Sequence, residues 1–176
     1  MPYITDDFVK GNLSMNVNWS GLEYLIGVLF LILLIVSIVF LLKRQYRKGL
    51  YLLFLNTIIT VSLFLPIVAP KIEKHVQGAP IAFYESIAGK DVYLNVLGFK
   101  SYAHLFYSKK QFKNSSKALG IDQDSYDRWL KEGEIDKPVY FVCKVQDQND
   151  YKTLPNIELI KEEGGFAFFK RLPKNR

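Results

Sequence analysis

Two long apolar runs without a charged residue stand out in the first part of the chain. The first, residues 24–42, lies between Glu23 and Lys43. As a helix with a rise of about 1.5 Å per residue, a run of this length spans roughly the hydrocarbon core of a bilayer. The second, residues 49–70, contains Pro66, where we expect a kink or the end of the helix. The pattern predicts two membrane-spanning helices. Two buried helices of a soluble protein are the less favoured alternative, because uncharged runs of this length are rare there.

Four positive charges lie between the two runs, in the sequence KRQYRK at residues 43–48. Positively charged short loops are retained in the cytoplasm. We therefore expect a two-helix transmembrane hairpin over residues 22–70 with a cytoplasmic turn at 43–48. Residues 1–21 then form an extracytoplasmic loop, and residues 71–176 form an extracytoplasmic domain.

After residue 71, charged and apolar residues alternate in short segments. The predicted helices cover 80–89, 101–107 and 124–132, with Asp124 as the cap of the last one, and 109–120 is expected to be a loop. Continuous apolar runs predict strands at 91–97, 139–143 and 166–170. Residues 155–164 are predicted as a helix opened by Pro155, and a hairpin that turns at Gly164-Gly165 is the alternative. Strands that alternate with helices indicate a small α/β domain with a mostly parallel three-stranded sheet.

Composition excludes several classes of function. The 176 residues include 23 Lys and Arg against 17 Asp and Glu, with both signs interspersed, so a nucleic-acid partner is not expected. One cysteine and two distant histidines argue against a disulfide framework and a metal cluster. No nucleotide-binding or hydrolase motif is present, so we expect no cofactor and assign no catalytic residue. Cys143 lies in an apolar run and is predicted to be a buried packing residue.

Two groups of residues are candidates for binding substrate or lipid phosphate. Lys71, Lys74 and His75 follow the second apolar run, at the height of the lipid phosphates. Simple anchoring at the membrane surface explains them equally well. The second group follows the first predicted strand, where ligands of α/β sheets bind, and a polar packed turn is the more economical explanation for it. Its members are Lys100, Ser101, Tyr102 and His104.

Several segments together resemble a known family. They are residues 19–21, which lead into the first apolar run, and residues 70–74, 98–107 (GFKSYAHLFY), 133–138 and 164–166. In these segments the chain resembles the carboxyl-terminal part of bacterial GT-C glycosyltransferases. These integral-membrane enzymes are related to the dolichyl-phosphate-mannose protein mannosyltransferases and the aminoarabinose lipid A transferases. The resemblance covers about the last third of a family member.

The resemblance implies a multi-pass protein of the bacterial inner membrane with its carboxyl-terminal domain in the periplasm. Such enzymes transfer a sugar from a polyprenyl-phosphate donor at the outer membrane face. Their catalysis is attributed to an acidic residue in the first outward loop, and no segment of this sequence matches that loop. The expected partners are membrane lipid, the polyprenyl-phosphate sugar donor and an amino-terminal transferase half, without which we expect the chain to be an inactive fragment. The alternative is a free-standing, membrane-anchored periplasmic binding or interaction protein.

Overall fold

The computed structural model describes residues 3–154 and 156–173 and divides the chain into two compact units. One unit is the apolar hairpin, residues 16–74. The other is the α/β domain, which combines residues 1–15 with residues 75–176. The domain therefore combines a segment that precedes the hairpin in sequence with a segment that follows it.

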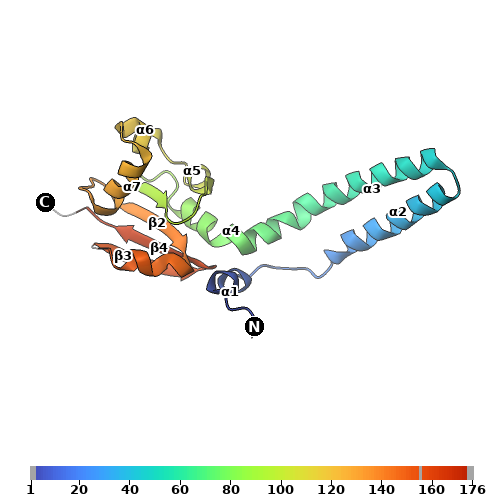
Figure 1. Cartoon of the computed structure of the whole chain (residues 1–176), viewed down its shortest axis with the longest axis horizontal. Coiled ribbons are helices and arrows are strands. Elements are labelled where there is room, and N and C mark those ends of the chain that lie inside the picture. Colours follow the sequence, from blue (N-terminus) through green and yellow to red (C-terminus); the bar gives the residue numbers. More distant parts are fainter. Residues whose placement is uncertain (1–2, 155, 174–176) are drawn as a thin grey trace. The chain divides into compact units, whose positions relative to one another are not determined.

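The hairpin consists of α2 (Tyr24–Leu42) and α3 (Tyr46–Ile67) (Figure 1). Both are long and apolar enough to cross a membrane, and α3 is followed closely by α4 (Ala69–Ser86). The first predicted span has the same limits as α2. α3 ends one residue after Pro66, as a proline near a helix end favours. The turn itself is shorter than the basic segment, because Arg47 and Lys48 already belong to α3.

Small and polar side chains hold the two helices together. A Cβ atom at Gly49 would lie 2.7 Å from the Leu41 side chain and 3.1 Å from the Ser37 carbonyl oxygen, so glycine lets the helices approach closely near the turn without displacing Leu41. Farther along, the Asn56 amide donates a hydrogen bond to the Phe30 carbonyl, with an N···O distance of 3.1 Å. Most large apolar side chains of α2 and α3 are exposed, which is the arrangement expected of helices that face lipid.

The α/β domain contains a four-stranded mixed sheet with the order β1-β2-β4-β3. β1 pairs with β2 in parallel, whereas β4 pairs with both β2 and β3 in antiparallel orientation. The expectation of a mostly parallel, three-stranded sheet is therefore wrong. The strands are β1 (Tyr93–Val96), β2 (Val139–Lys144), β3 (Ile157–Glu163) and β4 (Phe166–Arg171).

The additional strand, β3, lies where a helix was predicted. Gly164 and Gly165 have φ angles of +58° and +78°, and this left-handed conformation allows the tight turn between β3 and β4. After Ile157 the β3 side chains are exposed, as suits the edge of the sheet. The hairpin alternative is thus the correct one for this segment, and Pro155 lies outside the described residues.

Helices cover both faces of the sheet. On one face, Tyr126 and Leu130 of α7 (Gln123–Glu132) pack against Phe141 and Phe169. On the other face, α4 contributes a second core cluster, whose buried residues are Ala79, Phe83, Tyr84, Ile87, Leu94, Val142, Phe166 and Phe168. Because alternate side chains of a strand point to opposite faces, β2 and β4 supply residues to both clusters.

The remaining helices are short and differ in part from the predictions. They are α5 (Ala103–Tyr107), η1 (Phe112–Asn114), α6 (Ser116–Leu119), η2 (Val145–Asp147) and α8 (Gln148–Lys152). η1 and α6 lie within the predicted loop 109–120. Asp122, and not Asp124, caps α7 by accepting hydrogen bonds from two backbone N–H groups. α4 begins well before the predicted helix 80–89, so Pro80 lies in its interior.

Helix α1 (Asp7–Leu13) packs on the turn between β3 and β4. The Phe8 and Phe166 rings meet edge to face, with centroids 5.2 Å apart. A Cβ atom at Gly11 would lie 2.2 Å from the Gly165 nitrogen, so neither helix nor turn leaves room for a side chain there. The segment predicted as a loop before the first span therefore contains a helix of the α/β domain.

Candidate functional site

A charged cluster lies at the end of the hairpin away from its turn, which we call the open end. Lys71 forms an ion pair with Glu23, the residue that precedes α2. Glu23 also accepts hydrogen bonds from the Ser20 backbone (3.0 Å) and hydroxyl (2.8 Å). The Lys71 ammonium lies 5.5 Å from the centre of the Trp19 ring, within the range of a cation–π interaction. Of the predicted phosphate-binding residues, Lys71 is thus already paired with a carboxylate.

The hydrogen bond from Lys71 and those from the backbone lower the pKa of Glu23 well below its usual range. Burial acts in the opposite direction but is the smaller effect. The carboxylate is therefore ionised at neutral pH and balances the charge of Lys71. An anionic ligand would have to compete with Glu23 for Lys71, whose side chain remains a quarter exposed.

A groove with a volume of about 560 Å³ runs along the open end of the hairpin. Gly27 contributes to this space, because nothing lies within 4 Å of the position that a Cβ atom would take there. Apart from Glu23 and Thr60, the lining is apolar or aromatic, and its residues are Glu23, Tyr24, Ile26, Gly27, Phe30, Thr60, Phe64 and Val68. A groove of this kind suits a hydrocarbon chain, and the polar end of such a ligand would lie near the Glu23–Lys71 ion pair.

The other two residues of this predicted group differ from Lys71. Lys74 is exposed. His75 belongs to the α/β domain, where its Nδ1 atom lies 3.3 Å from the carbonyl oxygen of Asn12 in α1. Lys71 and Lys74, by contrast, belong to the hairpin unit. A shared phosphate site for these three residues stays a prediction.

A smaller cavity, of about 160 Å³, lies at the carboxyl ends of β1 and β2. Lys100 and Ser101 line it, as do Tyr84 and Lys144. The Lys144 ammonium also lies 5.0 Å from the centre of the Phe8 ring. Lys144 was missed in the sequence, although the parallel pairing of β1 and β2 brings their carboxyl ends to one edge. Two lysines and a tyrosine at this cavity favour an anionic or hydroxylated ligand.

The other two residues of the second predicted group do not line this cavity. Tyr102 is 81% exposed, whereas His104 is 7% exposed and packs edge to face on Tyr84, with ring centroids 6.2 Å apart. Burial, and then the positive charge of Lys110, lower the pKa of His104 to about 4, while a hydrogen bond with the Ser101 backbone opposes this. His104 is therefore neutral at pH 7 and acts as a packing residue.

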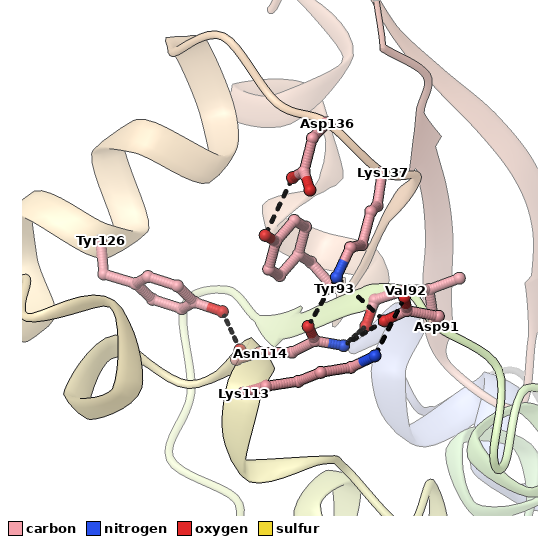
Figure 2. Close-up of polar contacts among 8 residues, drawn as sticks. All are labelled: Asp91, Val92, Tyr93, Lys113, Asn114, Tyr126, Asp136 and Lys137. Carbon is pink, nitrogen blue, oxygen red and sulfur yellow. Dashed lines mark hydrogen bonds and ion pairs between the residues drawn. The ribbon is translucent and has the colours of Figure 1, made fainter.

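A polar network at the amino end of β1 was not predicted from the sequence (Figure 2). Asp91 accepts hydrogen bonds from Asn114 and Lys137, each at 3.0 Å, and pairs with Lys113 at 3.1 Å. These contacts, led by the Asn114 hydrogen bond, lower the pKa of Asp91 below its usual range. Tyr126 in turn donates to the Asn114 carbonyl at 2.7 Å. Because these groups are paired with one another, the network ties η1 to the start of β1 and is structural.

Comparisons with known proteins found little. No family model and no curated protein matches the chain. Among solved structures, the crystal structure of ArnT from Cupriavidus metallidurans in the apo state is similar, with a TM-score of 0.34 and 13% sequence identity. The match covers 93% of this chain and 35% of that chain, so this chain spans about a third of that protein. A likeness at this level establishes neither a family nor a function.

Proposed function

We propose that this chain is the carboxyl-terminal module of a membrane glycosyltransferase that uses a polyprenyl-phosphate-linked sugar at the outer face of the bacterial inner membrane. In this proposal the groove at the open end of the hairpin receives part of the polyprenyl chain. That groove is the observation that carries the proposal, and the family resemblance of residues 98–107 agrees with it.

The chemistry of the groove matches such a lipid. A polyprenyl chain is a long, apolar hydrocarbon, and the groove presents aromatic and aliphatic side chains to it. The phosphate of the donor lies at the membrane surface, where Lys71 supplies a positive charge. Because the Lys71 side chain is a quarter exposed, a phosphate can reach it and compete with Glu23 for its charge.

The catalytic residues would belong to an amino-terminal membrane half. Two helices provide only one wall of a binding site, whereas a donor and an acceptor held together at membrane depth need several surrounding helices. The proposed role of this chain is therefore to bind lipid and to shape access for the acceptor. The α/β domain lies in the periplasm in this proposal, and the basic turn faces the cytoplasm.

A photo-crosslinking experiment tests the lipid site. The full chain is reconstituted in nanodiscs with a polyprenyl phosphate that carries a diazirine in its hydrocarbon chain, and labelled peptides are mapped by mass spectrometry. We expect labelling to concentrate on peptides with Gly27, Phe30 and Phe64. Unlabelled polyprenyl phosphate should compete, and polyprenol without phosphate should compete less well.

Two variants make this test specific. Gly27→Leu fills the groove and should reduce labelling several-fold. Ser62→Leu adds similar bulk at an exposed position of α3 that is not among the groove residues, and should leave labelling unchanged. Labelling spread evenly over the exposed surfaces of both helices, or equal effects of the two variants, would contradict the proposal.

An activity assay tests whether sugar transfer requires an amino-terminal membrane half in addition to this chain. The chain is expressed alone or together with the amino-terminal membrane half of a GT-C glycosyltransferase, and transfer from a lipid-linked sugar is measured. We expect transfer only when both are present. Turnover by this chain alone would show that it carries its own catalytic residues. If the chain binds an envelope component but never polyprenyl phosphate, the interaction-protein alternative replaces this proposal.

A further inference from the structure

One segment of the α/β domain has an extreme distribution of charge. Between Asp91 and Asp122 the sequence contains no Asp or Glu. The same segment contains five lysines, at positions 100, 109, 110, 113 and 117. Elsewhere in the domain both signs are interspersed. Residues 92–121 therefore give one part of the domain a positive potential.

Large apolar side chains of the same segment are exposed. Tyr102 is 81% exposed, Phe106 77% and Phe112 72%, and Leu105 is 42% exposed. Tyr102 and Phe106 are four residues apart at α5, so they lie on the same side of that helix. We define the basic aromatic surface as these four exposed side chains together with the exposed Lys100 and Lys109 of the same segment. The segment that carries it follows β1, which is the edge strand of the sheet opposite β3.

Hydrogen bonds hold the backbone beneath this surface in place. Asn114 is 1% exposed and joins the segment to Asp91, as described above. Lys110 donates a hydrogen bond to the Leu94 carbonyl of β1 at 3.3 Å. Ser115 caps α6 by accepting from the Ala118 N–H. The exposed aromatic rings therefore project from an ordered framework, and little conformational entropy is lost when they bind.

We propose that the basic aromatic surface binds a bilayer that contains anionic lipids. A Tyr ring prefers the boundary between headgroups and hydrocarbon, because its body is apolar and its hydroxyl is polar, and Phe and Leu side chains insert into the apolar side of that boundary. Lysine carries its charge on a long, flexible stem that reaches lipid phosphates while the stem contacts apolar groups. Charge complementarity favours this occupant, since the segment contains no Asp or Glu and exposes Lys100, Lys109 and Lys117. Its other two lysines are engaged within the domain, Lys113 with Asp91 and Lys110 with the Leu94 carbonyl. The chain also contains two helices that are long and apolar enough to cross a membrane, and these would anchor the domain to a bilayer. The inference does not rest on sugar transfer.

A fluorescent label tests the contact in the full chain. Phe106→Cys, in a chain with Cys143→Ala, is labelled with an environment-sensitive dye and reconstituted in nanodiscs. The lipid is phosphatidylcholine alone or mixed with phosphatidylglycerol, and a trace of lipid with a quencher at the headgroup boundary is included. We expect a blue shift and quenching at position 106 that are about twofold stronger with phosphatidylglycerol. The matched control is Asn149→Cys, an exposed position of α8, which should show neither.

Lysine variants test the electrostatic part. The triple variant Lys100→Gln, Lys109→Gln, Lys117→Gln should abolish the dependence on phosphatidylglycerol. Each lost lysine should lower the ratio of membrane-bound to free domain about fivefold. The control combines Lys131→Gln, Lys152→Gln and Lys161→Gln, which remove the same charge elsewhere on the domain. Equal quenching at positions 106 and 149, or equal effects of the two triple variants, would overturn the proposal. A blue shift in detergent that grows with protein concentration would also overturn it, by showing that a second copy covers the surface.

These results are independent of the test of the hairpin groove. Crosslinking of polyprenyl phosphate can fail while the label at position 106 still responds to anionic lipid. If polyprenyl phosphate crosslinks to the groove but the label at position 106 does not respond to anionic lipid, the groove proposal stands and the surface proposal fails.

Discussion

The side-chain amide of Asn56 in α3 donates a hydrogen bond to the backbone carbonyl of Phe30 in α2, at 3.1 Å. Asn56 is 1% exposed although it lies in an otherwise apolar helix. A polar group in hydrocarbon has no water to bind, so it favours a partner on a neighbouring helix. This contact fixes how far one helix is shifted along the other. It lies between the closely packed end of the hairpin, near Gly49, and the open end that contains the groove.

Replacing Asn56 should weaken the hairpin. We expect Asn56→Leu to reduce the free energy of helix–helix association by about 1 kcal/mol, because the hydrogen bond to Phe30 is lost. Steric trapping in micelles measures this free energy. The control is Thr57→Val, because the Thr57 hydroxyl bonds only to the Leu53 carbonyl of its own helix. Equal losses for the two variants would show that the Asn56 contact does not hold the helices together.

His104 should make the stability of the α/β domain depend on pH. Its pKa is lowered from 6.5 to about 4 in the folded chain, mainly by burial. The unfolded chain therefore binds more protons than the folded chain between these two values, and stability falls as the pH drops from about 6.5 towards 4. The loss should be about 3 kcal/mol and should level off below the folded pKa. Denaturant unfolding at several pH values measures it.

The control for this prediction is His104→Gln, which removes the titrating group. It should flatten the pH dependence in that window, whatever its effect on stability at pH 7. An NMR titration gives the pKa directly. A midpoint near 6.5 for the His104 ring would contradict the buried position.

Loss of Asn114 should release the segment before α7. Asn114→Ala removes the hydrogen bonds to Asp91 and to the Val92 carbonyl, and leaves Lys137 without one of its acceptors. We expect a destabilisation of about 2 kcal/mol, since the buried Asn114 side chain makes three hydrogen bonds that are lost together. Faster hydrogen exchange at residues 109–121 should accompany it. Lys113→Ala, which removes an exposed ion pair of the same network, should have a much smaller effect.

Cysteine labelling in intact cells tests the proposed topology. Cys143 is buried and burial raises its pKa to about 12, so the native thiol should not react. Ser115→Cys and Asn149→Cys should react with an impermeant maleimide from the periplasmic side. Gln45→Cys, in the turn of the hairpin, should react only after the membrane is permeabilised. The opposite pattern would show that the α/β domain faces the cytoplasm.

The hairpin could be predicted from the sequence because one local signal, the absence of charge over the thickness of a bilayer, defines it. β3 could not, because its apolar residues Ile157 and Ile160 suit one face of a helix as well as a strand. Pairing with β4 decides the outcome, and this pairing depends on the Gly164-Gly165 turn. The sheet order depends on such long-range contacts, and local patterns do not contain them.

For the candidate sites, too, local sequence patterns indicate some residues, whereas long-range contacts determine the others. Lys100 and Ser101 were predicted because they directly follow a strand, and the structure places both at one cavity. Their neighbour Lys144 is distant in sequence, and it is brought close only by the parallel register of β1 and β2. Glu23 as the partner of Lys71 was missed for a similar reason, since 48 residues separate them. His104 was one of four candidate ligand residues in the second group; the structure buries it against Tyr84, and a role in binding stays a prediction.

The contact between Phe8 and Phe166 constrains how the protein is made. Residues on both sides of the apolar hairpin meet in one folded body, so both must reach the same aqueous compartment before that body is complete. In a membrane, this requires an even number of crossings between them. The ribosome synthesises Phe8 long before Phe166, so α1 must wait in that compartment until the strands that it packs against have been made. Any arrest of insertion between the two spans would leave that early helix without the strands that it covers.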